Sequence, residues 1–214
     1  MTTRVTGLTG ATLPDVAPVC HECVWWQSRT AGRSVDKRRW IEKAETEFGA
    51  WGTVYYDGDD GRVLGSMQYG PARLFPRAAE LPAGPPSDDA VLVTCAYLVD
   101  RTSPWVLQSL FLAAIGEAKD KGAAALETFA YRYPEGVSDY ERFLVHRTVF
   151  PRDFLSDFGF QTVRSSGRVE LARLELGGLL PVVEGKRAKV LRVVREAFSP
   201  APVLERPEVT QYVG

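Results

Sequence analysis

The sequence lacks several features that define whole classes of protein. No apolar run approaches the roughly 18 residues of a membrane-spanning helix, and the first ten residues have neither the basic start nor the apolar stretch of a signal peptide. The formal net charge is −1 over 214 residues, so the strong basic excess typical of nucleic-acid-binding proteins is missing. We therefore expect a cytoplasmic protein that binds neither a membrane nor nucleic acid.

Cysteine and histidine are scarce, with three and two residues respectively. An odd and small number of cysteines makes a poor disulfide framework. The segment Cys20-His21-Glu22-Cys23 brings metal-capable side chains together. However, a zinc site needs about four ligands, and the sequence has no second pair of cysteines or histidines. We expect no metal site, although redox or metal sensing through Cys20 and Cys23 stays open as a third interpretation.

Two apolar runs indicate the centre of a sheet, and the 45% of hydrophobic residues suits one α/β domain. Residues Ala90–Val99 and Ala124–Tyr131 are continuously apolar apart from a few positions, which is typical of strands covered on both faces. Between them, Ser103-Pro104 predicts a helix start and Gly122 a helix end. A strand, a helix and a strand in this order predict a parallel pair with a right-handed crossover.

Shorter patterns predict the remaining elements. Ser34 resembles an N-cap, because Trp40, Ile41, Ala44 and Phe48 follow it at helical spacing. Further strands are expected at residues 4–8, 53–56, 62–69, 160–163 and 169–176, with a long loop at 71–86, an irregular insertion at 132–148 and a short helix at 151–158. We expect one domain at residues 1–180, a helix packed on it at 181–198, and a flexible tail at 199–214.

The order of these elements, with Asp-Phe-Gly-Phe at 157–160, resembles the GNAT superfamily of N-acetyltransferases. One branch of that superfamily is more similar. It has a cysteine pair followed by an aromatic pair near the N-terminus, and stretches like Phe75–Ala79, Ala125–Phe129 and Phe150–Leu155. The resemblance covers about Val5 to Leu176. It implies an α/β fold with a mixed, mainly antiparallel sheet of six to seven strands and helices on both faces.

The resemblance also implies a function. Members of the family use acetyl-CoA as acyl donor and a small-molecule or peptide amine as acceptor, and a homodimer is compatible with this pattern. The two inner strands splay apart, the pantetheine arm lies in the gap, and the pyrophosphate sits on free N–H groups at the start of the next helix. The matching residues for cofactor binding are Leu98, Val99, Arg101, Ser103, Trp105, Val106 and Leu107.

The predicted phosphate-binding turn departs from the family's pattern. Members normally carry glycines there, whereas Trp105 and Leu107 occupy the matching positions in this sequence. Their side chains are expected to compete with the pyrophosphate for space, and Asp100 would repel it. Trp105 has two open interpretations, because it could stack on adenine or cover the edge of the domain. Backbone N–H groups would remain available, since donors of this kind do not depend on side-chain identity.

The family's usual proton donor is also replaced. Many members place a tyrosine in the short helix where this sequence has Leu155. Acetyl transfer needs a deprotonated amine and a protonated or stabilised leaving thiolate, so the catalytic candidates are Glu127, Tyr131 and His146. Glu127 could instead pair with a cation. We expect an acyl-CoA-dependent N-acetyltransferase; the alternative is a catalytically silent GNAT-fold module that binds a ligand or a protein.

Overall fold

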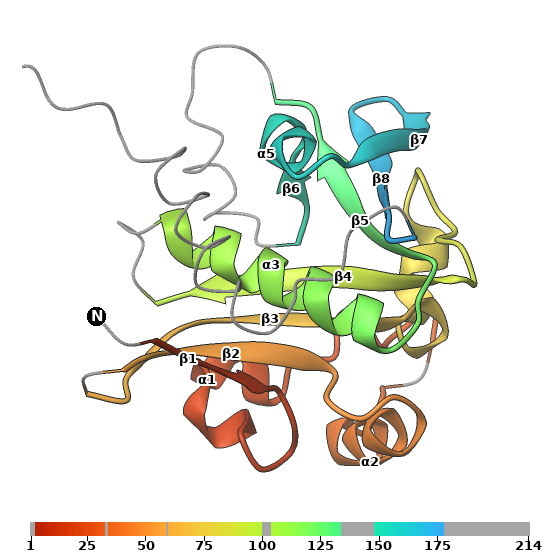
Figure 1. Ribbon diagram of the computed structural model, residues 1–214. Helices are drawn as coiled ribbons and strands as arrows, with labels where there is room; N and C mark the ends of the chain where they lie inside the picture. The colour runs from red at the N-terminus through yellow and green to blue at the C-terminus, as the bar shows by residue number, and fades with distance from the viewer. Residues whose placement is uncertain (1–2, 33, 59, 100–103, 134–147, 178–214) are drawn as a thin grey trace, which may run out of the picture. The chain divides into compact units, whose positions relative to one another are not determined.

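The computed structural model describes residues 3–32, 34–58, 60–99, 104–133 and 148–177, and these form one mixed sheet (Figure 1). The order is β1-β2-β3-β4-β5-β8-β7, and β6 pairs with β5. All neighbours are antiparallel except β4–β5 and β5–β6. The strands are β1 (Thr3–Gly7), β2 (Gly52–Asp57), β3 (Val63–Pro71), β4 (Ala90–Leu98), β5 (Ala125–Tyr131), β6 (Phe150–Pro151), β7 (Gln161–Ser166) and β8 (Val169–Glu175).

This arrangement confirms the predicted fold class and the predicted centre of the sheet. Within the described residues the sheet has eight strands where six to seven were expected, because the short β6 was not predicted as a strand. Strands β4 and β5 are adjacent, parallel and flanked on both sides by other strands. Helix α3 (Pro104–Asp120) connects them, as the apolar runs on either side of Ser103-Pro104 predicted. The expected helix at 181–198, the tail at 199–214 and most of the insertion at 132–148 lie outside the described residues.

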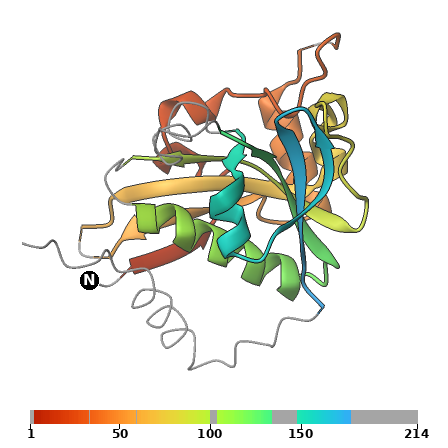
Figure 2. The ribbon, with the colours of Figure 1, turned by 90° about the horizontal axis from the view of Figure 1, so that it is seen from above.

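Helices cover both faces of the sheet (Figure 2). Helix α3 and the short α5 (Arg152–Asp157) contribute to the core on one face. Helix α2 (Lys37–Glu47) contributes to the core on the other face, where α1 (Pro18–His21) and the N-terminal segment also lie. None of the described helices is long and apolar enough to cross a membrane.

Helix α2 begins two residues later than the sequence suggested. Asp36, not Ser34, is the N-cap, and its carboxylate accepts a hydrogen bond from the Arg39 N–H at 3.2 Å. A carboxylate at this position satisfies one of the free N–H groups and also favours the positive end of the helix dipole. The predicted buried face is confirmed, since Trp40, Ile41 and Ala44 are all buried.

The proline-rich segment at 71–86 is more ordered than the loop that its composition predicted. It contains two 3₁₀ helices, Ala72–Leu74 and Pro76–Glu80. Phe75 lies between them and is fully buried on the α2 face of the sheet. The segment is tied to the N-terminal region by Arg77, whose guanidinium covers the ring of Trp25 and donates to its carbonyl. It therefore forms part of the cover of this face.

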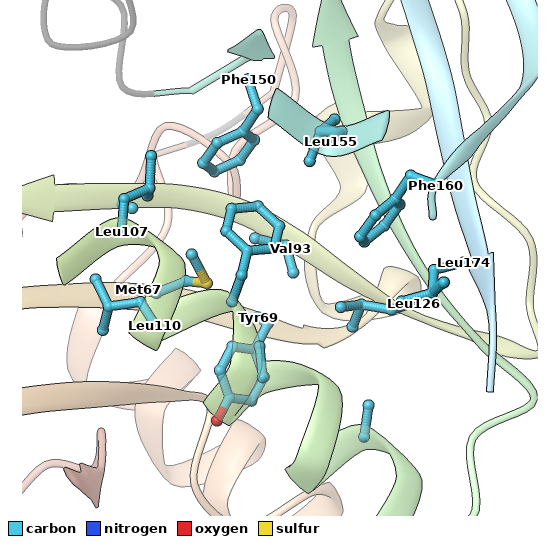
Figure 3. Close-up of a cluster of buried hydrophobic side chains, with 14 of the residues drawn as sticks. Met67, Tyr69, Val93, Leu107, Leu110, Leu126, Phe150, Leu155, Phe160 and Leu174 are labelled. Atoms are coloured by element: carbon cyan, nitrogen blue, oxygen red, sulfur yellow. The ribbon is translucent and has the colours of Figure 1, made fainter. Parts of the chain in front are cut away.

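Phe111 lies at the centre of the core between α3 and the sheet. Its ring packs edge-on against Phe150 of β6 at 4.9 Å between ring centres, and against Phe154 of α5 at 5.4 Å. Phe158 and Phe160 also contact it. Leu107, Phe150, Leu155 and Phe160 point into the same cluster (Figure 3). One aromatic ring thus joins the helix that follows β4 to the segment that returns after the insertion.

Replacing Phe111 by alanine should therefore lower the free energy of unfolding by about 3–5 kcal/mol, because it deletes a fully buried ring and leaves a cavity. Val163→Ala is the matched control, since that side chain is 52% exposed, and it should change stability by about 0.5 kcal/mol or less. Urea denaturation measures both. Equal small effects would show that Phe111 does not join these elements.

Candidate functional site

A β-bulge interrupts strand β4 at its midpoint. Gln68 of β3 pairs with Cys95, but the next residue, Tyr69, pairs with Val93, so Thr94 is an extra residue on β4. The Thr94 hydroxyl donates to the side-chain oxygen of Gln68 at 3.0 Å, and both residues are buried. A bulge bends its strand and increases the local twist, and this hydrogen bond fixes the bend from the neighbouring strand.

The two inner strands separate where the bulge lies. Their parallel pairing runs from Ala90 opposite Ala125 to Val93 opposite Thr128 and ends there, although β4 continues to Leu98. No described strand pairs with the β5-facing edge of β4 beyond Val93.

The direction of the free backbone groups follows from the antiparallel ladder with β3. The Val99 N–H donates to the carbonyl of Leu64 at 2.9 Å. Backbone groups alternate in direction along a strand, so the N–H groups of Ala96 and Leu98 point the other way, toward the gap. The Val99 N–H, by contrast, is already used. The sheet therefore offers an open strand edge of the kind that the resemblance implied.

The opposite side of the gap is partly covered. Strand β8 pairs along the whole of one edge of β5, so β4 and β6 share the other edge. Phe150 and Pro151 of β6 pair with Ala130 and Tyr131 at the end of β5. An extended ligand arm entering the gap would thus find an open edge on β4 but not on this part of β5.

Trp105 and Leu107 were expected to compete with the pyrophosphate for space at the start of α3, but the structure places the Leu107 side chain elsewhere. Val106 and Leu107 are buried in the core beneath the sheet, so the Leu107 side chain does not stand over the helix start. Trp105 is 40% exposed, and its ring packs edge-on against Tyr55 of β2 at 5.7 Å between ring centres. This position fits the interpretation that Trp105 covers the edge of the domain.

A close approach between α3 and the sheet accompanies this arrangement. A Cβ atom at Gly65 of β3 would lie 3.0 Å from the Val106 Cγ1 and 3.0 Å from the Tyr97 carbonyl. Glycine at this position therefore lets the first turn of α3 lie directly against β3 and β4. The first N–H groups of any helix have no acceptor within it, so this turn carries backbone donors that the helix itself does not use.

Glu127 lies in the part of β5 that pairs with β4, opposite Leu92. Its carboxylate is buried and accepts hydrogen bonds from the backbone N–H and the hydroxyl of Ser87, both at 2.7 Å. It also forms an ion pair with Arg173 at 3.1 Å, and Arg173 in turn binds Asp89 through two hydrogen bonds of 2.9 Å. These contacts fit the ion-pair interpretation of Glu127 better than a general base.

The structure describes only some of the other residues that the sequence pointed to. Tyr131 is half-buried at the end of β5, in the open half of the central pair, and its ring lies 4.8 Å from that of Tyr133. Leu155 is buried in the core and offers no proton donor. His146, Arg101 and Ser103 lie outside the described residues.

Glu170 of β8 contacts the chain on both sides of the insertion that follows β5. Arg132 at the start of the insertion and Arg152 at the start of α5 form ion pairs with the Glu170 carboxylate, the second at 3.3 Å. The Thr162 hydroxyl donates to the same carboxylate at 2.6 Å. Burial acts to raise the pKa of Glu170, but the hydrogen bonds from Thr162 and Arg132 and the charges of both arginines outweigh it, so the pKa is lowered.

A largely apolar pocket of about 240 Å³ lies beside the bulge, on the α2 face. Gln68, Cys95 and Tyr97 contribute to it from the sheet, and Lys37 contributes from the first turn of α2. The sequence analysis missed Lys37. A signal was present, because Lys37 precedes Trp40 by three residues and Ile41 by four, and so shares their buried helix face.

Cys20, Cys23 and Cys95 also line this pocket, and none of them forms a disulfide. Burial is the main reason that the pKa of the Cys95 thiol is raised to about 12, so this thiol is a poor nucleophile at neutral pH. Within the described ranges, no group of three or more histidine, cysteine or acidic side chains is placed to hold a metal ion. The sensing interpretation of Cys20 and Cys23 stays a prediction.

Comparison with known proteins gives similarity only to solved structures. No protein-family profile and no curated protein matches the sequence. A GCN5-related N-acetyltransferase from Kribbella flavida is 18% identical, with 81% of this chain and 98% of that chain covered and a TM-score of 0.44. An N-acetyltransferase from Staphylococcus aureus Mu50 is 15% identical, with 82% and 99% covered and a TM-score of 0.46.

A third similar structure is a GNAT family acetyltransferase from Brucella melitensis in complex with acetyl-CoA. It is 13% identical, with 84% of this chain and 92% of that chain covered and a TM-score of 0.40. With identities of 18% or less and TM-scores below 0.5, these likenesses carry no argument about activity. The fold is established by the strand order and register of the chain itself.

Glu170→Gln should lower the free energy of unfolding at neutral pH by about 1–3 kcal/mol. The substitution removes a buried charge that accepts hydrogen bonds or ion pairs from Arg132, Arg152 and Thr162. A carboxylate with a lowered pKa stabilises the fold above its unfolded pKa, about 4.3 for glutamate, and this contribution is lost as pH falls through the lower folded pKa. The difference between wild type and variant should therefore shrink as the pH falls below about 5.

Asp153→Asn is the matched control, since Asp153 also lies beside Arg152 but is 86% exposed. It should have little effect at any pH. Urea denaturation across this range measures all three proteins. A difference between wild type and Glu170→Gln that does not change with pH would contradict the assignment.

Proposed function

We propose that the protein is an acetyl-CoA-dependent N-acetyltransferase that works in the cytoplasm on a small-molecule or peptide amine. The observation that carries this proposal is the bulge at Thr94, which lies where β4 leaves β5 and is followed by an open strand edge. The N–H groups of Ala96 and Leu98 on that edge can pair with an extended ligand, in the manner of an added strand.

The described residues fit a pantetheine arm ending in phosphates. The arm would bind along Ala96 and Leu98 of β4, and its pyrophosphate would bind at the first turn of α3. That turn needs no glycine, because the Leu107 side chain lies in the core and the Trp105 ring packs against Tyr55, which leaves the backbone donors as the binding groups. When bound, acetyl-CoA supplies an activated acyl group that an amine can attack.

The chain's own residues would support transfer in three ways. The open edge of β4 orients the donor, and the pocket beside the bulge shields the amine from water. Tyr131 is the proposed proton donor, since it lies at the open end of the inner pair, whereas the Glu127 carboxylate is occupied by Ser87 and Arg173. His146 stays a second candidate for this role, and Arg101 and Ser103 stay candidates for phosphate binding.

A catalytically silent binding module is the second candidate function. Strand β6 covers the end of β5, and Leu155 is a core residue where many members of the GNAT superfamily have a tyrosine. Both features support a fold that keeps the cofactor gap without the full catalytic set. Calorimetric titration with acetyl-CoA and coenzyme A, followed by a thiol-release assay, separates the two.

Trp105→Asp should weaken coenzyme A binding by about tenfold, because it adds a negative charge at the positive end of α3 beside the phosphates. The side chain is exposed enough to be replaced without disturbing the core. Trp105→Asn is the matched control, since it removes the same ring without adding charge, and it should bind within about threefold of wild type. The difference should shrink as salt is raised.

Calorimetry at two salt concentrations measures this effect. Equal affinities for the two variants would show that the phosphates do not lie at the start of α3. Absence of coenzyme A binding by wild type and both variants would contradict the proposed function itself.

A further inference from the structure

The pocket beside the bulge has an apolar wall and a small polar region. Trp26 and Trp51 line it, together with aliphatic side chains of the N-terminal segment such as Leu13 and Val16. Gln68, which accepts the hydrogen bond from Thr94, and Cys95, the residue after Thr94, line it from the sheet. A ligand seated there would lie directly next to the point where β4 leaves β5.

Lys37 brings a cation into this apolar pocket. Its side chain is only 8% exposed, and its Nζ donates to the Cys23 carbonyl at 2.8 Å. The Nζ also lies 4.8 Å and 5.2 Å from the ring centres of Trp40 and Trp51. Among the described residues no carboxylate forms an ion pair with it. Burial is the main reason that the pKa of Lys37 is lowered.

A buried ammonium with no ion-pair partner among the described residues is costly unless an anion approaches it. Trp26 and Trp51 also line the pocket, and their buried indole N–H groups have no hydrogen-bond acceptor in the described part of the chain. The acceptor oxygen of the Gln68 side chain is already taken by Thr94. The pocket thus favours a ligand with a negative group.

The size of the pocket limits the rest of that ligand. An apolar cavity of about 150 Å³ accommodates one benzene ring, and this pocket has about 240 Å³. One ring, or a branched chain of similar volume, therefore fits with a few further atoms.

We propose that this pocket binds the acetyl acceptor, and that the acceptor is a small amine whose apolar body carries a carboxylate paired with Lys37. The acceptor role rests on the proposed acetyltransferase function, whereas the carboxylate site does not. In the transfer, the amine nitrogen forms a bond to the acyl carbon while the carbon–sulfur bond of acetyl-CoA breaks. The amine loses one proton, and the leaving thiolate takes one up.

Binding of 3-phenylpropionate and of its neutral amide, 3-phenylpropionamide, tests the carboxylate site. The two probes share one ring and one chain and differ in charge. Wild type should bind the acid at least about tenfold more tightly than the amide, since a charge pair formed in an apolar site is strong. Lys37→Met should lose that preference, because methionine keeps the volume and removes the charge.

Lys43→Met is the matched control, since Lys43 lies on the same helix and is 58% exposed, and it should keep the wild-type preference. Thermal unfolding checks that each variant is folded. If Lys37→Met does not fold, the comparison of acid and amide in wild type still decides. Equal binding of the two probes, no binding of either, or an unchanged preference in folded Lys37→Met would each overturn the proposal.

Titration of the same samples with coenzyme A separates this inference from the proposed function. A preference for the acid without coenzyme A binding would keep the carboxylate site and reject acetyl transfer. Coenzyme A binding without that preference would reject the carboxylate site alone. Thiol release with phenylalanine and with phenethylamine then tests the acceptor role. Phenylalanine should react at least about tenfold faster at low concentration, an advantage that Lys37→Met removes, and equal rates would overturn the role.

Discussion

The hydrogen bond between Thr94 and Gln68 holds the feature on which the rest of the site depends. It fixes one extra residue in the middle of a buried strand, and a bulge of this kind turns the strand away from its neighbour. Strands β4 and β5 stop pairing at the same point. The open edge of β4 begins at this irregularity, and the pocket beside Cys95 lies next to it.

The two cores of the sheet keep this opening in place from opposite faces. On one face, Phe111 joins α3 to the segment that returns after the insertion, and Gly65 lets the first turn of α3 lie against β3 and β4. On the other face, α2 brings Lys37 to the pocket. Glu170 ties the start of the insertion and the start of α5 to β8. Both proposed ligand groups, the phosphates and the carboxylate, would therefore meet parts of the fold that packing holds rigid.

Sequence patterns were sufficient for the central strands and insufficient for the site between them. The apolar runs at 90–99 and 124–131 predicted a buried parallel pair, because continuous apolar runs of this length are typical of strands covered on both faces. The bulge at Thr94 could not be predicted, since a single threonine does not interrupt the apolar run at 90–99. The partners of Glu127 are 40 and 46 residues away in the sequence, so only the fold shows that its carboxylate is occupied. Lys37 could have been found, because it shares a helix face with buried tryptophan.

Amide hydrogen exchange at Ala96, Tyr97 and Leu98, measured by nuclear magnetic resonance with and without coenzyme A, tests the open edge of β4 most directly. Tyr97 pairs with Ser66 of β3 and should be protected in both states. The Ala96 and Leu98 N–H groups should exchange faster than that of Tyr97 in the free protein and become protected when coenzyme A binds. Protection equal to that of Tyr97 without coenzyme A, or no change at saturation, would contradict an open strand edge that receives the cofactor.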